Sequence, residues 1–266
     1  MSAVISIDKC KVRQSFSSAA KSYDGFATLQ REVGRDLLSR FAMQCADDTI
    51  VDIGCGTGFL TQKLMSITPV QQMIAIDIAL SMLQITRSKL EQFKAVQYVC
   101  ADAEKLPLAE NSADHIVSNL ALQWCQNLNC VFNGFNKILK PGGQLSFSTF
   151  GPATLQELKN AWAEVDDYTH VNDFYSADEL LAFLQQAGLK NIQIETKRYH
   201  SKYQTVIELM RELKGIGAHN TLSGRHRGIT GKSRMQKMIE VYEKQRLNEL
   251  IPATYEIIFV SAKSEL

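Results

Sequence analysis

A glycine-rich run, Val51-Asp52-Ile53-Gly54-Cys55-Gly56-Thr57-Gly58, holds the residues best suited to bind a small molecule. Glycines let the backbone turn tightly and approach a ligand without Cβ atoms in the way. The acid before the first glycine argues against a dinucleotide, whose pyrophosphate prefers a positive helix N-terminus with no carboxylate beside it. Asp52 suits instead a ligand that is positively charged at this point, such as a sulfonium with a free amino group. We therefore assign to a ligand-binding turn Asp52, Gly54, Cys55, Gly56 and Gly58.

Two further acids follow the next two apolar segments. Asp77, followed by Ile78 and Met82, comes about twenty residues after the glycines, where a carboxylate can accept both hydroxyls of a ribose. Asp102, followed by Ala103, stands where it could meet the edge of an adenine. Either acid alone would more often be a helix cap or a surface charge. Their recurrence at successive segment ends favours a shared ligand site.

The segments that must position these acids alternate in type. Short apolar strands, each followed by a helix, predict a parallel sheet with helices on both faces. The strands are expected at residues 49–53, 73–76, 96–100, 115–118, 144–150, 191–199 and 255–262. Right-handed crossovers then bring Gly54, Asp77, Asp102 and Asn119 to one edge of the sheet, the edge at which open α/β sheets bind ligands.

One domain over residues 1–266 accommodates these elements. The helical spacing of apolar residues predicts an N-terminal helical cap at 1–45, ahead of a cofactor-binding core at 46–200. Residues 201–250 are mostly helical and basic, and they are too many for a hairpin loop, so we expect a lid insertion. The final strand then lies within 251–266.

The composition excludes several classes of protein. Hydrophobic residues make up 45% and charged residues 21%, which is ordinary for a globular domain. No run approaches the ~18 apolar residues of a membrane span, and the N-terminus lacks the apolar centre of a secretory signal. The six cysteines show no paired ligand spacing, so neither a disulfide framework nor a metal site is expected. We expect a cytoplasmic protein without membrane contact.

Positive charge is concentrated late in a chain whose net charge is only +1. From Lys197 to Arg246 there are twelve Lys and Arg against four Asp and Glu. Such a patch raises the local concentration of anionic partners, although a solvated helix face is the simpler alternative. No aromatic-rich strand or recognition motif accompanies the patch, so nucleic acid is not an expected partner. Two basic clusters stand out: Arg225, His226 and Arg227, and then Lys232, Arg234 and Lys237.

The glycine run, Asp77, Asp102 and the turn Leu139-Lys140-Pro141-Gly142-Gly143 resemble the pattern of class I methyltransferases. The similarity is tight over roughly residues 45–150 and looser over the whole chain. The resemblance implies a Rossmann-like, seven-stranded, mostly parallel sheet with a reversed last strand. It also implies N-terminal helices, a helical lid between strands six and seven, and S-adenosyl-L-methionine as cofactor.

Flanking motifs narrow the resemblance. They are Arg13-Gln14-Ser15-Phe16, Ala19-Ala20, Tyr23-Asp24, Ser118-Asn119-Leu120-Ala121-Leu122-Gln123-Trp124 and Leu213-Lys214-Gly215-Ile216-Gly217-Ala218-His219-Asn220. Together they resemble the malonyl-acyl-carrier-protein O-methyltransferases of biotin synthesis, and the last motif is the most specific. The resemblance implies methylation of the free carboxylate of a malonyl thioester. Its partner would be an acyl carrier protein, expected to dock on the basic lid at Arg225, Arg227, Lys232 and Arg234.

Carboxylate chemistry makes few demands on the protein. A carboxyl with a pKa near ~4 is already ionised at neutral pH and needs no general base. Catalysis then depends on aligning oxygen, methyl and sulfur and on excluding water. Amino-group methyltransferases carry an Asn/Asp-Pro-Pro-Tyr/Phe motif at the fourth strand. This sequence has Asn119-Leu120-Ala121-Leu122 there instead, which agrees with a carboxylate acceptor.

Three residues are expected to act on the substrate or the methyl donor. Tyr23 would close over the sulfonium by its hydroxyl or its ring, although a core tyrosine is an alternative. Arg225 would hold the carboxylate with its planar fork, and His219 would orient the substrate. Other cations open to this task are Arg227, Arg211, Lys214 and Arg13. The acceptor could instead be another small acid or a quinone-like carbon, and a non-catalytic cofactor-binding module is the other alternative.

Overall fold

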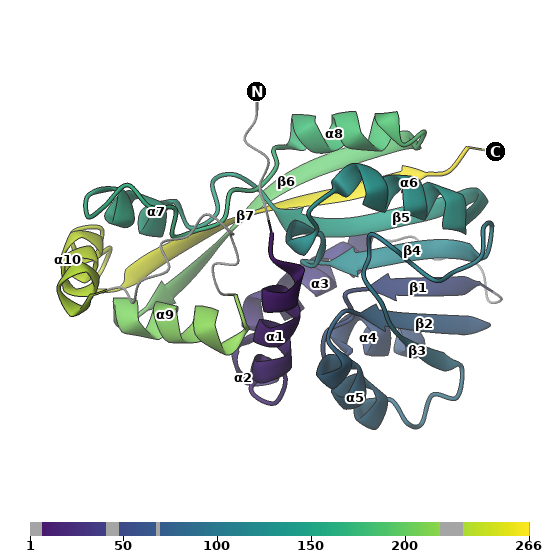
Figure 1. The fold of residues 1–266 in the computed structure, drawn as a ribbon, viewed down its shortest axis with the longest axis horizontal. Helices are drawn as coiled ribbons and strands as arrows, with labels where there is room; N and C mark the ends of the chain where they lie inside the picture. Colours follow the sequence, from purple (N-terminus) through teal and green to yellow (C-terminus); the bar gives the residue numbers. More distant parts are fainter. Residues whose placement is uncertain (1–6, 41–47, 68–69, 219–230, 266) are drawn as a thin grey trace.

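One sheet of seven strands runs through the molecule (Figure 1). The structure, a computed structural model, describes residues 7–40, 48–67, 70–218 and 231–265. The strands are β1 (Thr49–Ile53), β2 (Gln72–Asp77), β3 (Val96–Cys100), β4 (Ala113–Asn119), β5 (Leu139–Phe150), β6 (Lys190–Tyr203) and β7 (Ile251–Lys263). Each strand expected from the sequence is present, and β1 and β3 have the expected bounds.

The order of the strands is β3-β2-β1-β4-β5-β7-β6. The first five in this order are parallel, and β7 lies antiparallel to both β5 and β6. All five residues of β1 are buried, as expected of a central parallel strand covered on both faces. The seven-stranded, mostly parallel sheet with a reversed last strand is therefore confirmed.

Two apolar layers cover the sheet because successive strand residues point to opposite faces. Ile50 packs in one layer with residues of α3 (Thr28–Arg40) and α4 (Phe59–Ile67). Val51 packs in the other with residues of α6 (Leu128–Ile138) and α8 (Ala177–Gln186). The sequence predicts a helix over residues 81–93 in the β1–β3 half, and the structure has α5 (Leu80–Lys89) there, which ends four residues earlier.

The N-terminal cap consists of three helices, α1 (Lys9–Ala19), α2 (Tyr23–Phe26) and α3. The sequence predicts one helix through Val12 to Tyr23, and the structure breaks it. The Ser22 hydroxyl donates to the carbonyl of Ala19 in this break, at 3.1 Å. The break places Tyr23 at the start of a new helix, which matters for the site.

The lid insertion begins later than expected. Strand β6 continues to Tyr203, so residues 201–203 belong to the sheet, and α9 (Val206–Gly215) and α10 (Lys232–Glu243) follow. Long β6 and β7 pair along their whole length and extend toward α9 and α10, and α7 (Gln156–Ala163) lies beside α10 (Figure 1). None of the described helices is long and apolar enough to cross a membrane.

Candidate active site

A pocket lies at the carboxyl ends of β1 to β4, the edge that the strand order predicts. Gly54, Asp77, Asp102 and Asn119, from four different strand ends, all line it. The structure therefore brings together the residues that the crossover argument places on one edge. The other assigned residues that line this pocket are Gly56, Ile78, Met82 and Ala103.

The glycine turn shapes the floor of this pocket. Gly54 has a φ of +68°, and a Cβ there would lie 2.3 Å from the Cβ of Ala121. Gly54 is therefore fixed by both conformation and space. Gly56 also has positive φ, at +56°, but a Cβ there would meet no atom within 4 Å. The turn thus leaves free space on the side where a ligand would approach.

Asp77 is held rigidly at the end of β2. Its Oδ2 accepts the Gly56 N–H at 2.9 Å, and its Oδ1 accepts the Ala79 N–H at 2.8 Å. Burial raises the pKa of Asp77 to about 6 in spite of these hydrogen bonds. Each carboxylate oxygen keeps a further lone pair. Asp77 is therefore able to accept hydroxyl groups of a ligand.

Three assigned residues shape the turn without lining the pocket. Asp52 is 1% exposed and its Oδ2 accepts the Thr61 hydroxyl at 2.5 Å, within the protein. Burial, and then the charge of Asp77, raises the pKa of Asp52 to about 7. Cys55 is buried, and a Cβ at Gly58 would lie 2.6 Å from Thr86. We therefore assign Asp52 to the electrostatics of the pocket rather than to ligand contact.

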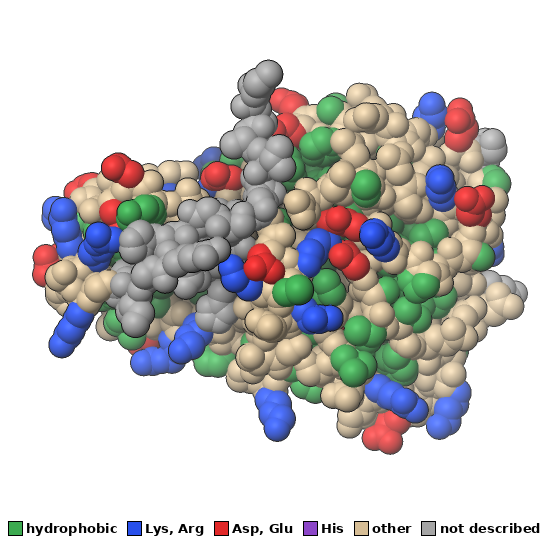
Figure 2. All heavy atoms as spheres, in the orientation of Figure 1, with side chains coloured by type: hydrophobic (Ala, Val, Ile, Leu, Met, Phe, Trp, Pro, Cys, Tyr) green, Lys and Arg blue, Asp and Glu red, His purple; other side chains and the backbone are tan. Residues whose placement is uncertain are grey.

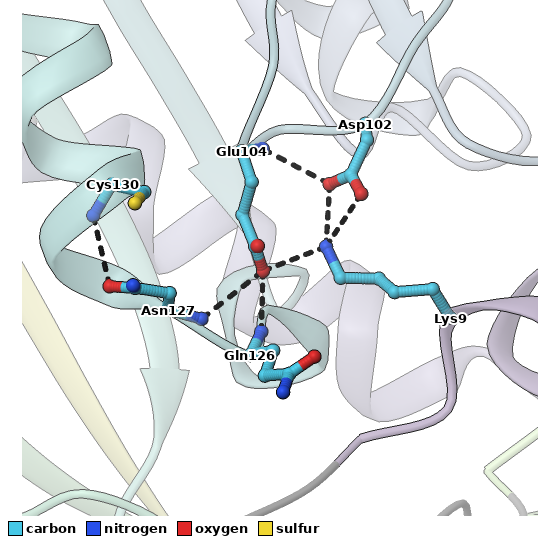
Figure 3. Close-up of polar contacts among 6 residues, drawn as sticks. All are labelled: Lys9, Asp102, Glu104, Gln126, Asn127 and Cys130. Carbon is cyan, nitrogen blue, oxygen red and sulfur yellow. Dashed lines mark hydrogen bonds and ion pairs between the residues drawn. The ribbon is translucent and has the colours of Figure 1, made fainter.

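Helix α1 forms a wall of the same pocket, through Lys9, Val12 and Phe16. The Lys9 Nζ contacts Asp102 Oδ1 at 2.6 Å and Glu104 Oε1 at 2.8 Å (Figure 3). The same Glu104 oxygen accepts the backbone N–H of Gln126 at 2.6 Å. The contacts fasten the first helix to the end of β3. Sequence reasoning missed Lys9, because a lysine near the N-terminus carries no signal of its own.

A second polar anchor holds Tyr23 in the pocket wall. Its neighbour Asp24 accepts the Thr57 hydroxyl at 2.6 Å and pairs with Lys89, so α2 is tied to the glycine turn and to α5. Tyr23 lines the pocket. Burial, and then the charge of Asp77, raises the pKa of Tyr23 well above its usual value. Its phenol therefore stays protonated and can donate a hydrogen bond.

A larger cavity of about 600 Å³ adjoins this pocket, and Trp124 lines both. We call the first space the cofactor pocket and the second the substrate cavity. The walls of the substrate cavity are largely apolar side chains from α3, α7, α9 and the segment between α7 and α8. They include Leu29, Leu158, Trp162, Met210, Leu213 and Phe174. Such walls keep water away from a bound group.

Polar side chains are gathered at one part of this cavity. Asp166 Oδ1 accepts a hydrogen bond from His170 Nε2 at 2.8 Å, and Asp166 Oδ2 lies 3.8 Å from the guanidinium of Arg234. The ring of His170 stacks on Trp162 with centroids 3.6 Å apart. Lys214 also lines the cavity. Among the described residues, Lys214 and Arg234 are therefore the lysine and the arginine that line the substrate cavity.

The cations proposed from the sequence have different outcomes. Arg225, Arg227 and His219 lie outside the described residues. Arg211 and Arg13 are exposed, and neither is among the described residues that line either space. Both stand on solvent-facing sides of helices whose opposite sides are packed. Arg234, assigned from the sequence to docking, is exposed and also lines the cavity.

The pocket fits S-adenosylmethionine by the chemistry of its walls. Asp77 offers acceptors for ribose hydroxyls, and apolar Ile78 and Met82 suit an adenine ring. Asp102 lines the pocket, but its carboxylate already accepts hydrogen bonds from Lys9 Nζ and from the Glu104 N–H. The buried carboxylates of Asp52 and Asp77 favour a cationic ligand. No group of three or more His, Cys, Asp or Glu placed to hold a metal occurs among the described residues.

Known proteins are similar in sequence to nearly the whole chain. A family model described as a methyltransferase domain matches residues 51–147. Malonyl-[acyl-carrier protein] O-methyltransferase of Nitrosospira multiformis is 41% identical over 95% of this chain and 88% of its own. The chain belongs to the malonyl-[acyl-carrier protein] O-methyltransferase family. It is therefore an S-adenosylmethionine-dependent methyltransferase, as the cofactor pocket indicates.

Two further comparisons concern a longer protein and a solved structure. The biotin biosynthesis bifunctional protein BioHC of Cellvibrio japonicus is 41% identical over 96% of this chain, which spans half of that longer protein. The solved structure of the YcgJ protein from Bacillus subtilis has a TM-score of 0.65 at 19% identity, over 88% of this chain and 98% of its own. That likeness shows the fold alone.

Proposed function

We propose that this methyltransferase transfers a methyl group to the free carboxylate of a malonyl thioester on an acyl carrier protein, an early step of biotin synthesis. The support is the name shared by relatives about 40% identical over nearly the full chain. The observation that carries the proposal is the substrate cavity, which meets the cofactor pocket at Trp124. The cytoplasmic location expected from the sequence stays a prediction.

The proposed chemistry needs no proton transfer by the protein. S-Adenosylmethionine, when bound, would supply a methyl group whose carbon a carboxylate oxygen attacks as the bond to the positively charged sulfur breaks, giving a methyl ester and S-adenosylhomocysteine. The carboxylate is ionised at neutral pH, so the protein has to align it and exclude water. Trp124 stands at the junction of the two spaces. In this proposal the neutral Tyr23 phenol closes over the bound S-adenosylmethionine and donates a hydrogen bond to it.

A cation must hold the second oxygen of the substrate carboxylate, since an unpaired charge in a water-poor cavity costs several kcal/mol. We propose Arg225 for this role, with Arg227 as the alternative, and His219 as a residue that orients the substrate. Among the described residues, Arg234 and Lys214 are the cavity-lining cations that could share it. Alanine at the correct position is expected to lower kcat/KM by a factor that corresponds to about 2–4 kcal/mol of lost transition-state stabilisation.

The carrier protein is proposed to dock where the cavity reaches the basic lid. Lys232 and Arg234 are exposed at the start of α10, and we propose that Arg225 and Arg227 extend this docking surface. Figure 2 shows Lys and Arg side chains along the α9–α10 end of one face. Charge at the rim of an interface mainly sets association rate and its dependence on salt.

The proposed substrate is tested by comparing acceptors at saturating S-adenosylmethionine. We expect kcat/KM to be highest for malonyl-carrier protein, lower for a free malonyl thioester, and lowest for free malonate. A quinone-like carbon acceptor should give no product. If free malonate or another small acid is methylated as efficiently as malonyl-carrier protein, the proposed substrate is wrong although the methyltransferase assignment stands.

A further inference from the structure

Asn172 is a buried carboxamide on the wall of the substrate cavity. It lies in the segment between α7 and α8, it lines the cavity, and it is only 7% exposed. Its Oδ1 has no hydrogen-bond partner within the described structure. A buried acceptor without a partner is unfavourable, and native proteins keep few of them. This acceptor therefore points to a ligand that supplies the missing hydrogen bond.

Gln30 of α3 repeats the same feature at another point of the cavity. It lines the cavity, and its buried Oε1 also lacks a partner within the described structure. The backbone carbonyl of Gln30 accepts the Asn119 Nδ2 at 2.9 Å, and Asn119 lines the cofactor pocket. Gln30 thus marks the inner end of the cavity. Arg234, which is exposed on α10 and lines the same cavity, marks the outer end.

The chemistry of these walls is specific. Most of the lining is apolar, so two carboxamide oxygens without partners are out of place unless the bound group supplies hydrogen-bond donors. A carboxamide pairs well with a secondary amide, because each offers both an N–H donor and a carbonyl acceptor. An ionised small acid with no N–H or O–H would offer neither oxygen a donor. A pantetheine-type arm, a chain of methylene and amide groups ending in the thioester, would satisfy them and the apolar walls together.

We propose that Asn172 and Gln30 recognise the amide groups of the arm that carries the acyl thioester, so that the cavity selects pantetheine thioesters over simple ones. This rests on the proposed function, of which it names the selecting residues. The two carboxamides act on binding of the arm and not on the methyl transfer itself. Their loss should therefore be visible only with substrates that contain the arm.

The test compares kcat/KM for two malonyl thioesters, that of pantetheine and that of ethanethiol, which has no amide. Asn172→Leu is expected to lose about tenfold with the pantetheine thioester, the worth of one hydrogen bond, and to stay within about twofold with the ethyl thioester. Gln30→Leu should show the same selective loss. Asn172→Asp, which keeps a carbonyl-type acceptor in either protonation state, should recover most of the activity on the pantetheine thioester.

Asn129→Leu is the matched control, because Asn129 of α6 also has a buried oxygen without a partner and is not among the residues that line the cavity. It should leave the preference between the thioesters unchanged. Equal losses with both thioesters in the Asn172 and Gln30 variants would overturn the proposal. So would a parent enzyme that uses both thioesters equally, while the proposed reaction would stand. A parent enzyme that methylates malonyl-carrier protein but neither small thioester would also overturn the proposal and leave the proposed reaction standing, whereas failure with malonyl-carrier protein as well would overturn both.

Discussion

Two buried carboxylates set the electrostatics of the cofactor pocket. Asp52 and Asp77 are 1% and 8% exposed, and burial raises the pKa of each carboxyl. Without a ligand, their ionised forms are held in surroundings that disfavour charge. A cationic ligand offsets this unfavourable burial of charge. The two acids therefore destabilise the ligand-free protein and stabilise the complex with the ligand. We therefore expect affinity and stability to respond to pH through these two residues.

Cofactor affinity should fall as pH falls through about 6, the pKa of Asp77 in the ligand-free protein. Protonation removes the negative charge and converts one oxygen to a donor, so ribose hydroxyls lose an acceptor. Calorimetry between pH 5 and pH 7 should show weaker binding at the lower pH in the parent. Asp77→Asn should reduce the dependence, and Asp77→Ala should weaken binding at pH 7 by ~10–100-fold. Unchanged affinity in Asp77→Ala would remove Asp77 from the ribose site.

Asp52 should make the ligand-free protein less stable at high pH. Its pKa is about 7 when folded and near 3.8 when unfolded, so its contribution is present below pH 3.8 and lost as pH rises through 7. Asp52→Asn stays neutral and should be more stable than the parent at pH 8 by ~1–3 kcal/mol, less what the contact with Thr61 loses. Denaturant unfolding at pH 5 and pH 8 measures this. An Asn variant that is less stable at both pH values contradicts it.

Site residues were predictable where they recur with the sheet. Gly54, Asp77 and Asp102 end successive parallel strands, and the crossover rule alone brings them together. Asp52 was assigned to the ligand, but it faces Thr61, because alternate residues of a strand point to opposite faces. Lys9 was not found, since its partner Asp102 is ninety-three residues away in sequence. Such a pairing depends on tertiary packing that no local pattern encodes.

At the scale of elements, helix α1 covers one side of the cofactor pocket and is held there by ion pairs. Lys9 ties the start of the helix to Asp102 and Glu104, while Phe16, later in the helix, packs edge-on against Trp124 with ring centroids 5.4 Å apart. The helix therefore contacts residues of the cofactor pocket through a charged end and an aromatic face. Removing the charged contacts should loosen the cover without removing its apolar packing.

Lys9→Ala is expected to raise the dissociation rate of S-adenosylmethionine by about threefold to tenfold, since the ion pairs lost are only partly buried. Stopped-flow displacement measures this rate directly. Lys11→Ala is the matched control, because Lys11 is 54% exposed and pairs with Asp8 beside its own helix. Equal dissociation rates in the parent and in Lys9→Ala would show that the cover does not limit release.

Helix α10 should carry part of the carrier-protein surface. Combined Lys232→Glu and Lys237→Glu reversal is expected to raise KM for malonyl-carrier protein by about threefold to tenfold at low salt, with little change for malonyl-pantetheine. Both lysines are exposed, whereas Arg234 also lines the cavity and would confuse the result. Lys63→Glu, at an exposed position of α4, is the control. A reversal that affects the two substrates equally would rule out docking on α10.

The elements were predicted well where apolar runs are short and bounded, as at Thr49–Ile53, and less well at helix ends and at the lid. Strand β6 runs to Tyr203 because it pairs with β7 along its whole length, a long-range contact that the sequence around residue 200 does not signal. The basic stretch also includes Lys197 of β6, which pairs with Asp36 of α3. Part of the positive charge therefore serves the fold and not the lid.

In the whole molecule, the two functional spaces share Trp124: the cofactor pocket lies at the strand ends of the parallel half, and residues of α7, α9 and α10 line the substrate cavity. The parallel half supplies the glycine turn and its acids, which the general pattern of the fold predicts. Most of the substrate cavity is built by elements that follow β5, with α3 and Trp124 contributing from earlier in the chain, and its apolar walls give no local motif. Its shape therefore had to come from the structure.

The most direct test of the central claim is the mass of the carrier protein after incubation with the enzyme and S-adenosylmethionine. We predict that malonyl-carrier protein gains the mass of one CH2, that fragmentation places the gain on the malonyl carboxylate, and that acetyl-carrier protein, which has no free carboxylate, is unchanged. Asp77→Ala should give the same product more slowly at limiting cofactor. Malonyl-carrier protein that keeps its mass, under conditions in which the enzyme binds S-adenosylmethionine, would contradict the account.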